Sequence, residues 1–157
     1  MLVNLGDGRF VEAATPFGLD SLRDARGLAA SDFDGDGDID FVVTNHNAEA
    51  HYFVNRAARG HWLKVRLRGS RSNRDAVGAV IRIKNGEWRQ MRVITAGDGY
   101  ASQFSRVAHF GLGDSSIVDE LEVRWPSGRR QILTRIRADQ LLDVEEDVTI
   151  AADRRSP

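Results

Sequence analysis

Aspartates occupy every second position from residue 32 to residue 40, and no other feature of the sequence constrains the fold as strongly. Two carboxylates about 5 Å apart repel each other by roughly 3 kcal/mol at an effective dielectric constant of about 20. Gathering several of them around one point is unfavourable unless a cation joins them. The pattern, with Gly35 and Gly37 inside it, therefore predicts a metal-binding loop.

The chemistry of the donors favours Ca²⁺. The carboxylates are hard oxygen ligands, no histidine or cysteine lies within the run, and a glycine-rich loop suits the flexible oxygen shell of calcium better than the strict octahedron of magnesium. We expect side-chain ligation by the carboxylates of Asp32, Asp34, Asp36 and Asp40. Asp38 is expected to bind through its backbone carbonyl, with its own carboxylate facing solvent. The alternative is a solvated acidic turn without an ion, and a bound ion is expected to hold the loop in shape rather than to catalyse.

An EF-hand begins with the same D-x-D-x-D-G pattern, so it has to be considered. The twelfth position counted from Asp32 is Val43, where an EF-hand requires a bidentate glutamate. The flanking residues are Gly/Ala-rich or β-branched rather than amphipathic and helical. The sequence therefore predicts a nine-residue loop that leads into a strand at residues 39–44.

The apolar segments are short, rich in β-branched and aromatic residues, and separated by clusters of Gly, Asp and Asn. This pattern is typical of an all-β protein. Residues 62–67 alternate between apolar and basic or polar positions, which predicts a strand with one face in a core and one in water. The Pro-Ser-Gly-Arg turn at residues 126–129 predicts a hairpin. The expected strands cover residues 2–3, 10–11, 27–30, 41–44, 52–54, 62–67, 77–83, 88–95, 107–110, 118–125, 130–136 and 140–144.

The chain divides into an acidic front and a mildly basic back. Residues 1–59 carry a net charge of −5 and residues 60–157 a net charge of +4. The front resembles one four-stranded unit, which cannot bury both of its faces alone and normally stacks on copies of itself, yet no second copy is present in the sequence. We predict one domain at residues 1–59, a second at residues 60–149, and a disordered tail at residues 150–157.

Composition excludes several classes of protein. A hydrophobic content of 41% over 157 residues is enough for a core, and the absence of cysteine excludes disulfides, thiolate metal sites and cysteine nucleophiles. No apolar stretch approaches the length of a membrane span. The first residues do not resemble a signal peptide, so an export signal, if there is one, is expected upstream of Met1.

Residues 2–10, followed by DFDGDGDIDFVVTN, resemble an FG-GAP/VCBS repeat. A series of motifs after residue 60 resembles the ASPIC/UnbV domain: HWLKV, SNRDAVGA, GDGYASQ, HFGLG and VRWPSG. The order of the two parts is similar to the cartilage acidic protein-like family. The resemblance implies a propeller blade with a calcium loop followed by a β-sandwich-like domain, in a secreted or periplasmic protein. It also implies binding to a protein or polysaccharide at a cell surface or in the matrix, upstream blades in the parent chain, and no established catalytic residues.

Two other functions stay open. A carbohydrate-active enzyme would need a cleft with paired carboxylates, whereas a structural cap of a β-propeller would show a large apolar face on residues 1–59. The four histidines are scattered in the sequence and are expected to be structural. The turn at residues 72–75 could bind an anion or sugar hydroxyls, although hydrogen bonds within the turn are the preferred explanation. The loop at residues 97–103 carries Tyr100, which could stack on a sugar ring, although packing is preferred.

Overall fold

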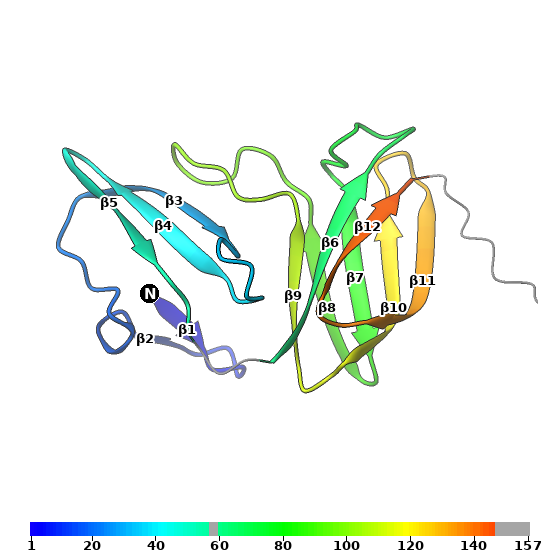
Figure 1. Cartoon of the computed structure of the whole chain (residues 1–157), viewed down its shortest axis with the longest axis horizontal. Helices are drawn as coiled ribbons and strands as arrows, with labels where there is room; N and C mark the ends of the chain where they lie inside the picture. The colour runs from blue at the N-terminus through cyan, green and yellow to red at the C-terminus, as the bar shows by residue number, and fades with distance from the viewer. Residues whose placement is uncertain (57–59, 147–157) are drawn as a thin grey trace, which may run out of the picture.

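The computed structural model describes residues 1–56 and 60–146. The described residues contain strands and one short 3-10 helix but no α-helix, which confirms the all-β prediction. The predicted tail at residues 150–157 and the centre of the predicted boundary at 57–59 lie outside the described residues. The strands form two lobes (Figure 1). The first lobe contains β1 (Leu2–Asn4), β2 (Phe10–Glu12), η1 (Thr15–Phe17), β3 (Ala25–Ser31), β4 (Asp40–Asn45) and β5 (Ala48–Phe53).

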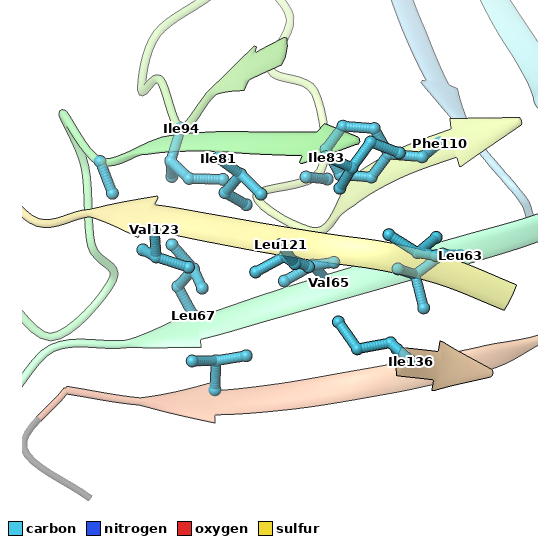
Figure 2. Packing of buried hydrophobic residues seen from close by; sticks show 14 of the residues in the cluster. Leu63, Val65, Leu67, Ile81, Ile83, Ile94, Phe110, Leu121, Val123 and Ile136 are labelled. Atoms are coloured by element: carbon cyan, nitrogen blue, oxygen red, sulfur yellow. The ribbon is translucent and has the colours of Figure 1, made fainter. Parts of the chain in front are cut away.

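The second lobe is built from two open sheets that share one apolar core. Its strands are β6 (His61–Arg68), β7 (Val80–Asn85), β8 (Trp88–Val93), β9 (Ala108–Gly113), β10 (Ile117–Arg124), β11 (Arg130–Arg137) and β12 (Gln140–Glu145). One sheet is antiparallel in the order β11-β10-β7-β8, and the other has the order β12-β6-β9, with β12 parallel to β6. Figure 2 shows how side chains from both sheets meet, among them Leu63, Val65, Ile81, Phe110 and Leu121.

The predicted alternation in β6 is confirmed, because Leu63, Val65 and Leu67 are buried in this core. Burying one such side chain fully stabilises the folded state by about 2 kcal/mol. The opposite face of β6 carries Arg66 and Arg68, which are exposed. The basic face is therefore largely in water, as the pattern predicts, with one exception at Lys64 that is described below.

The predicted hairpin at residues 126–129 is also confirmed. Arg124 of β10 pairs with Arg130 of β11, and the Trp125 amide donates to the Arg129 carbonyl at 2.9 Å. The Trp125 ring is buried, and its Nε1 donates to Gln131 Oε1 at 3.1 Å, which satisfies the polar end of the indole. The start of β7 differs from the expected residue 77, because the chain still turns at Gly78, where φ is +94°.

The first lobe has very little apolar core of its own. Its strands form an antiparallel sheet in the order β3-β4-β5 and a separate β1-β2 hairpin. Among residues 1–56 the buried apolar side chain is Ala13. The large apolar side chains that remain exposed in this lobe are Met1, Leu2, Leu5, Phe10, Val11, Phe17, Leu22, Leu28, Phe33, Tyr52 and Val54.

A buried glutamate closes one end of the second lobe. Glu146 follows β12, and its Oε2 accepts hydrogen bonds from the consecutive amides of Ser70, Arg71 and Ser72 at 2.7–3.0 Å. Its Oε1 accepts from the hydroxyls of Ser72 and Ser127 at 2.9 and 2.5 Å. The turn after β6 thus holds an anion that belongs to the chain itself. The Asn73 side chain bonds the amide and the carbonyl of Val77, as expected from the sequence. The Asp75 carboxylate, also expected to hold this turn, instead pairs with Arg106 at 2.9 Å.

These bonds set the charge state of Glu146. Burial alone would raise the pKa of its carboxyl, but the Ser127 hydroxyl and the amides of Ser72 and Ser70 lower that pKa from 4.5 to about 2. A carboxyl whose pKa is lower in the folded state stabilises the fold above its unfolded pKa, and this stabilisation is lost as the pH falls through the folded value. Glu146 therefore contributes its full stabilisation of the folded state at neutral pH, and this stabilisation decreases progressively between pH 4.5 and about 2.

We predict that Glu146→Gln lowers the free energy of unfolding by about 2 kcal/mol at pH 7, because the amide cannot accept all the bonds that the carboxylate accepts. Urea denaturation at several pH values measures this. The difference from the wild type should shrink as the pH falls from 4.5 toward 2. Glu145→Gln is the matched control, because the neighbouring Glu145 side chain is exposed and pairs with Arg68 at 3.3 Å. Equal losses in the two variants would contradict the role given to Glu146.

Candidate metal centre

The aspartate loop is the connection between two antiparallel strands. Ser31 at the end of β3 pairs with Asp40 at the start of β4, and residues 32–39 form the loop between them. Gly35 and Gly37 have φ values of +82° and +99°, a region that residues with a Cβ rarely adopt. The turn brings their amides onto the first aspartate: Asp32 Oδ1 accepts from Gly35 N at 2.6 Å, and Oδ2 accepts from Gly37 N at 2.8 Å.

The structure brings three of the five predicted ligands together. Asp32, Asp34 and Asp40 each offer a carboxylate oxygen, and the three oxygens lie within 4.8 Å of one another. Asp40 is fully buried: its Oδ2 accepts from Phe33 N and the Tyr52 hydroxyl, both at 3.1 Å. Its Oδ1 accepts from the amide of Asn55 at 2.8 Å. The carboxylate of Asp40 is therefore fixed in position before any ion binds.

The other two predicted ligands lie outside this group of three. The carboxylate of Asp36 accepts a hydrogen bond from the amide of Asp38 at 3.0 Å, which caps the loop locally. Asp38 was expected to turn its carboxylate to solvent, but one of its oxygens, Oδ2, is buried and has no hydrogen-bond partner. A buried carboxylate oxygen without a partner is costly, so a cation or an ordered water in the loop would stabilise it.

Side chains of the second lobe bind this loop directly. The Lys64 ammonium forms an ion pair with Asp32 Oδ2, and the two side chains are 18% and 1% exposed. His109 Nε2 donates to the Gly37 carbonyl at 2.7 Å. Lys64 of β6 lies directly opposite His109 of β9, and the Trp62 ring stacks near His109, with ring centres 6.4 Å apart. These side chains come from the face of the sheet that is turned away from the core.

These contacts affect the pKa values of Asp32 and His109. Burial raises the pKa of the Asp32 carboxyl, but the Lys64 ammonium and the amides of Gly37 and Gly35 outweigh it, so the net pKa lies below its ordinary value. Burial lowers the pKa of the His109 imidazole, and its bond to the Gly37 carbonyl opposes this only in part. Asp32 is thus held as an anion beside a single positive charge, while Asp34 and Asp40 lie nearby.

Sequence reasoning missed Lys64 and His109 as parts of this site. They lie 32 and 72 residues from their partners in the loop, and each belongs to a strand whose pattern explains it as an ordinary surface position. His61, also expected to be structural, pairs through Nδ1 with Asp139 Oδ2 at 2.7 Å. Tyr100 of the loop at residues 97–103 is exposed rather than packed, while the backbone beside it lies close to Gly27 of β3.

The donor set fits calcium better than any other common metal. The ligand atoms are carboxylate oxygens, and three of them lie close enough to share one ion. Backbone carbonyls and water can complete a calcium shell of about six to eight oxygens. Zinc would favour histidine or cysteine, and His109 is already occupied by the Gly37 carbonyl. The three converging donors are therefore of the chemical kind that hard cations prefer.

An acidic groove lies beside this loop, and it bears on the enzyme alternative. It has a volume of about 370 Å³ and is lined by Asp36, Asp38, Asp114, Asp139 and His61, among others. The hydrogen bond from His61 lowers the pKa of the Asp139 carboxyl. A glycosidase needs one carboxyl that stays protonated near neutral pH, which is opposite to the state favoured for Asp139.

No helix among the residues with described positions has the length and apolar character required to cross a membrane.

Substitution of Gly35 or Gly37 by alanine tests the contact between the loop and the second lobe. A methyl group at Gly37 would overlap the Trp62 indole, whereas a methyl group at Gly35 would meet nothing within 4 Å. We predict that Gly35→Ala lowers the free energy of unfolding by about 1 kcal/mol, because of its positive φ alone. Gly37→Ala should lower it by about 3 kcal/mol, since it also forces the loop away from β6. Thermal or urea unfolding measures both, and similar losses would contradict the packing described.

Comparisons with known proteins agree with the motifs after residue 60. Residues 69–151 match the family described as ASPIC and UnbV. Cartilage acidic protein 1 of Xenopus tropicalis is 33% identical over 156 residues, covering 90% of this chain and 23% of that protein. The human protein of the same name is 33% identical over 109 residues, covering 66% of this chain and 16% of that protein. The chain thus spans less than a quarter of the length of these relatives. The match over more than half of its residues shows that the chain belongs to the ASPIC and UnbV family.

Proposed function

We propose that the chain is a calcium-binding, non-catalytic interaction module of an exported protein. The observation that carries this proposal is the convergence of Asp32, Asp34 and Asp40 within 4.8 Å. Three carboxylates at this separation repel one another by several kcal/mol in total. The single ammonium of Lys64 offsets only part of that charge, so a divalent cation has a strong electrostatic reason to bind.

Calcium acts in this proposal as a structural element. It neutralises the loop, which joins β3 to β4 in a lobe that has almost no apolar core. Asp36 and Asp38 enter the ligand set through small movements of the loop, Asp36 by its side chain and Asp38 by its backbone carbonyl. The ordered loop then fixes the first lobe against the second, through the contacts that Gly37 makes with His109 and Trp62.

The partner in this proposal is a protein or polysaccharide outside the cell or in the periplasm. Relatives named for cartilage support an extracellular place for the parent protein. The second lobe supplies a rigid two-sheet core, from which loops such as residues 97–103 project. Exposed loops on a rigid scaffold are the common place for recognition, and Tyr100 is an exposed aromatic side chain of the kind that binds sugars or proteins.

We interpret residues 1–59 as a single FG-GAP/VCBS-like propeller blade and residues 60–149 as a β-sandwich-like ASPIC/UnbV domain. The hairpin that carries the aspartate loop supports the first part, and the two sheets around one core support the second. Upstream blades of the parent chain would stack on the first lobe in this arrangement.

A structural cap of a β-propeller is a second candidate, which the exposed apolar side chains of the first lobe favour. A groove of about 730 Å³ lies on this lobe, lined by Phe17, Leu19, Phe41, Tyr52 and Phe53, among others. Exposed apolar surface of this extent indicates a docking surface. The two candidate functions are compatible, because a blade can bind calcium at its loop and pack another blade on its face.

The first test is thermal unfolding of the chain with excess calcium and with chelator. A ligand that binds only the folded state stabilises it by about 2.7 kcal/mol at a concentration one hundred times its dissociation constant. We expect calcium to raise the melting temperature of the wild type. Asp34→Ala should abolish the rise, because it removes one of the three converging carboxylates.

Asp20→Ala is the matched control, because Asp20 is an exposed aspartate of the same lobe outside the loop. It should retain the full calcium-dependent rise. A rise that persists in Asp34→Ala, or no rise in any of the three proteins, would rule out calcium binding at this loop.

The apolar groove can be tested with a dye that fluoresces on apolar surfaces. Phe17→Ser should reduce the fluorescence of bound anilinonaphthalene sulfonate, since Phe17 is exposed and lines the groove. Met91→Ser should not, because Met91 is an exposed side chain of β8 in the second lobe and does not line this groove. Equal effects of the two substitutions on the fluorescence would show that the dye does not bind preferentially to the groove.

A further inference from the structure

Lys64 occupies an unusual position for a lysine on the outer face of a strand. Its neighbours Arg66 and Arg68 on that face point into water and pair with Asp143 and Glu145 of the adjacent strand β12. The Lys64 ammonium instead crosses to the first lobe and pairs with Asp32, whose side chain is 1% exposed. It also lies 4.7 Å from the centre of the Trp62 ring.

We propose that Lys64 is the built-in counter-ion of the aspartate loop and that it competes with Ca²⁺ for the Asp32 carboxylate. This inference rests on the calcium binding proposed above. It identifies Lys64 as the residue that sets the affinity of the loop for calcium. The Lys64 ammonium donates to Asp32 Oδ2, and the same carboxylate contributes an oxygen to the group formed with Asp34 and Asp40. An ion bound to Asp32 would stand within about 5 Å of an ammonium on the same carboxylate, a separation at which like charges repel strongly.

Lys64 lines a cavity that can accommodate its ammonium group after calcium displaces it from Asp32. Lys64 lines a cavity of about 590 Å³ between the lobes, together with Asp32 and His109. Asp98 also lines this cavity and offers a second carboxylate on its wall. A lysine side chain has four rotatable bonds to its ammonium, so it can leave Asp32 without any movement of β6.

The exchange couples the ion to the contact between the lobes. Without calcium, the Lys64–Asp32 ion pair adds to the bond between His109 and the Gly37 carbonyl. When calcium binds the Asp32 carboxylate, the Lys64–Asp32 ion pair is lost, while the contacts of Gly37 with His109 and Trp62 remain. The free energy of calcium binding is therefore reduced by the ion pair it breaks, and Lys64 lowers the calcium affinity of the loop.

Isothermal titration of the whole chain with calcium chloride tests this directly. Lys64→Met removes the charge and keeps the length of the side chain, and we expect it to tighten calcium binding roughly tenfold. Lys64→Arg keeps the charge and should bind calcium within about threefold of the wild type. Lys84→Met is the matched control, because Lys84 is exposed on β7 and is the only other lysine in the sequence. It should leave the affinity unchanged.

The outcomes separate this inference from the proposed function. Calcium binding in the wild type with no tightening in Lys64→Met would overturn the role of Lys64 and leave the calcium site standing. Equal tightening in Lys64→Met and Lys64→Arg would also overturn it, since charge would not be the cause. Binding that appears only in Lys64→Met supports the role of Lys64 but overturns the proposed calcium binding of the wild-type chain, and no binding in any variant would overturn both. Circular dichroism of each variant shows that it is folded.

The emission of Trp62 provides a second readout. Because the Lys64 ammonium lies over the Trp62 ring, its departure should change the fluorescence of that ring. We expect a calcium-dependent change in the wild type that is lost in Trp62→Phe and reduced in Lys64→Met. Calcium binding to the wild type without any change in the Trp62 emission would show that the ammonium stays in place, which contradicts the exchange.

Discussion

Repulsion among carboxylates dominates the first lobe, and the local structure counters it in several ways. The amides of Gly35 and Gly37 donate to Asp32, and Asp40 accepts three hydrogen bonds while fully buried. The Lys64 ammonium adds one positive charge from the other lobe. These contacts hold the carboxylates close together and leave an excess of negative charge at one point, which is the condition for binding a hard cation.

The two lobes differ in how much apolar core they contain. The second lobe holds nearly all the buried apolar side chains of the described residues, in a core between two sheets. The first lobe keeps many of its large apolar side chains at the surface. Its position relative to the second lobe depends on contacts of the aspartate loop with β6 and β9. An ion in the loop would therefore matter more for this lobe than for a unit that has a core of its own.

Much of the fold could be predicted from the sequence, because strands and hairpins follow from patterns over a few residues. The alternation in β6 and the turn at residues 126–129 are of this kind, and the structure confirms both. Of the candidate site, the run of alternate aspartates identified the loop. It did not reveal that Asp36 bonds locally or that an oxygen of Asp38 is buried, since these depend on how the loop turns at two glycines with positive φ.

Contacts between distant residues could not be predicted in the same way. Lys64, His109 and Glu146 each fit an ordinary strand or loop position in the sequence, and their partners lie 32, 72 and about 75 residues away. The amides of Ser70 and Ser72, just before and at the start of the turn at residues 72–75, donate to the Glu146 carboxylate, which the sequence pattern of that turn did not indicate. The pairing of β6 with β9 places Lys64 opposite His109, and the parallel pairing of β6 with β12 brings Glu146 to the turn after β6.

The most direct test of the account is a crystal structure of the chain grown in calcium, with anomalous diffraction used to locate the ion. The account predicts one calcium peak about 2.4 Å from its oxygen ligands. These are carboxylate oxygens of Asp32, Asp34, Asp36 and Asp40 and the backbone carbonyl of Asp38, and the Lys64 ammonium is no longer on Asp32. A structure without a peak at the loop, in which Lys64 still pairs with Asp32 under saturating calcium, would contradict it.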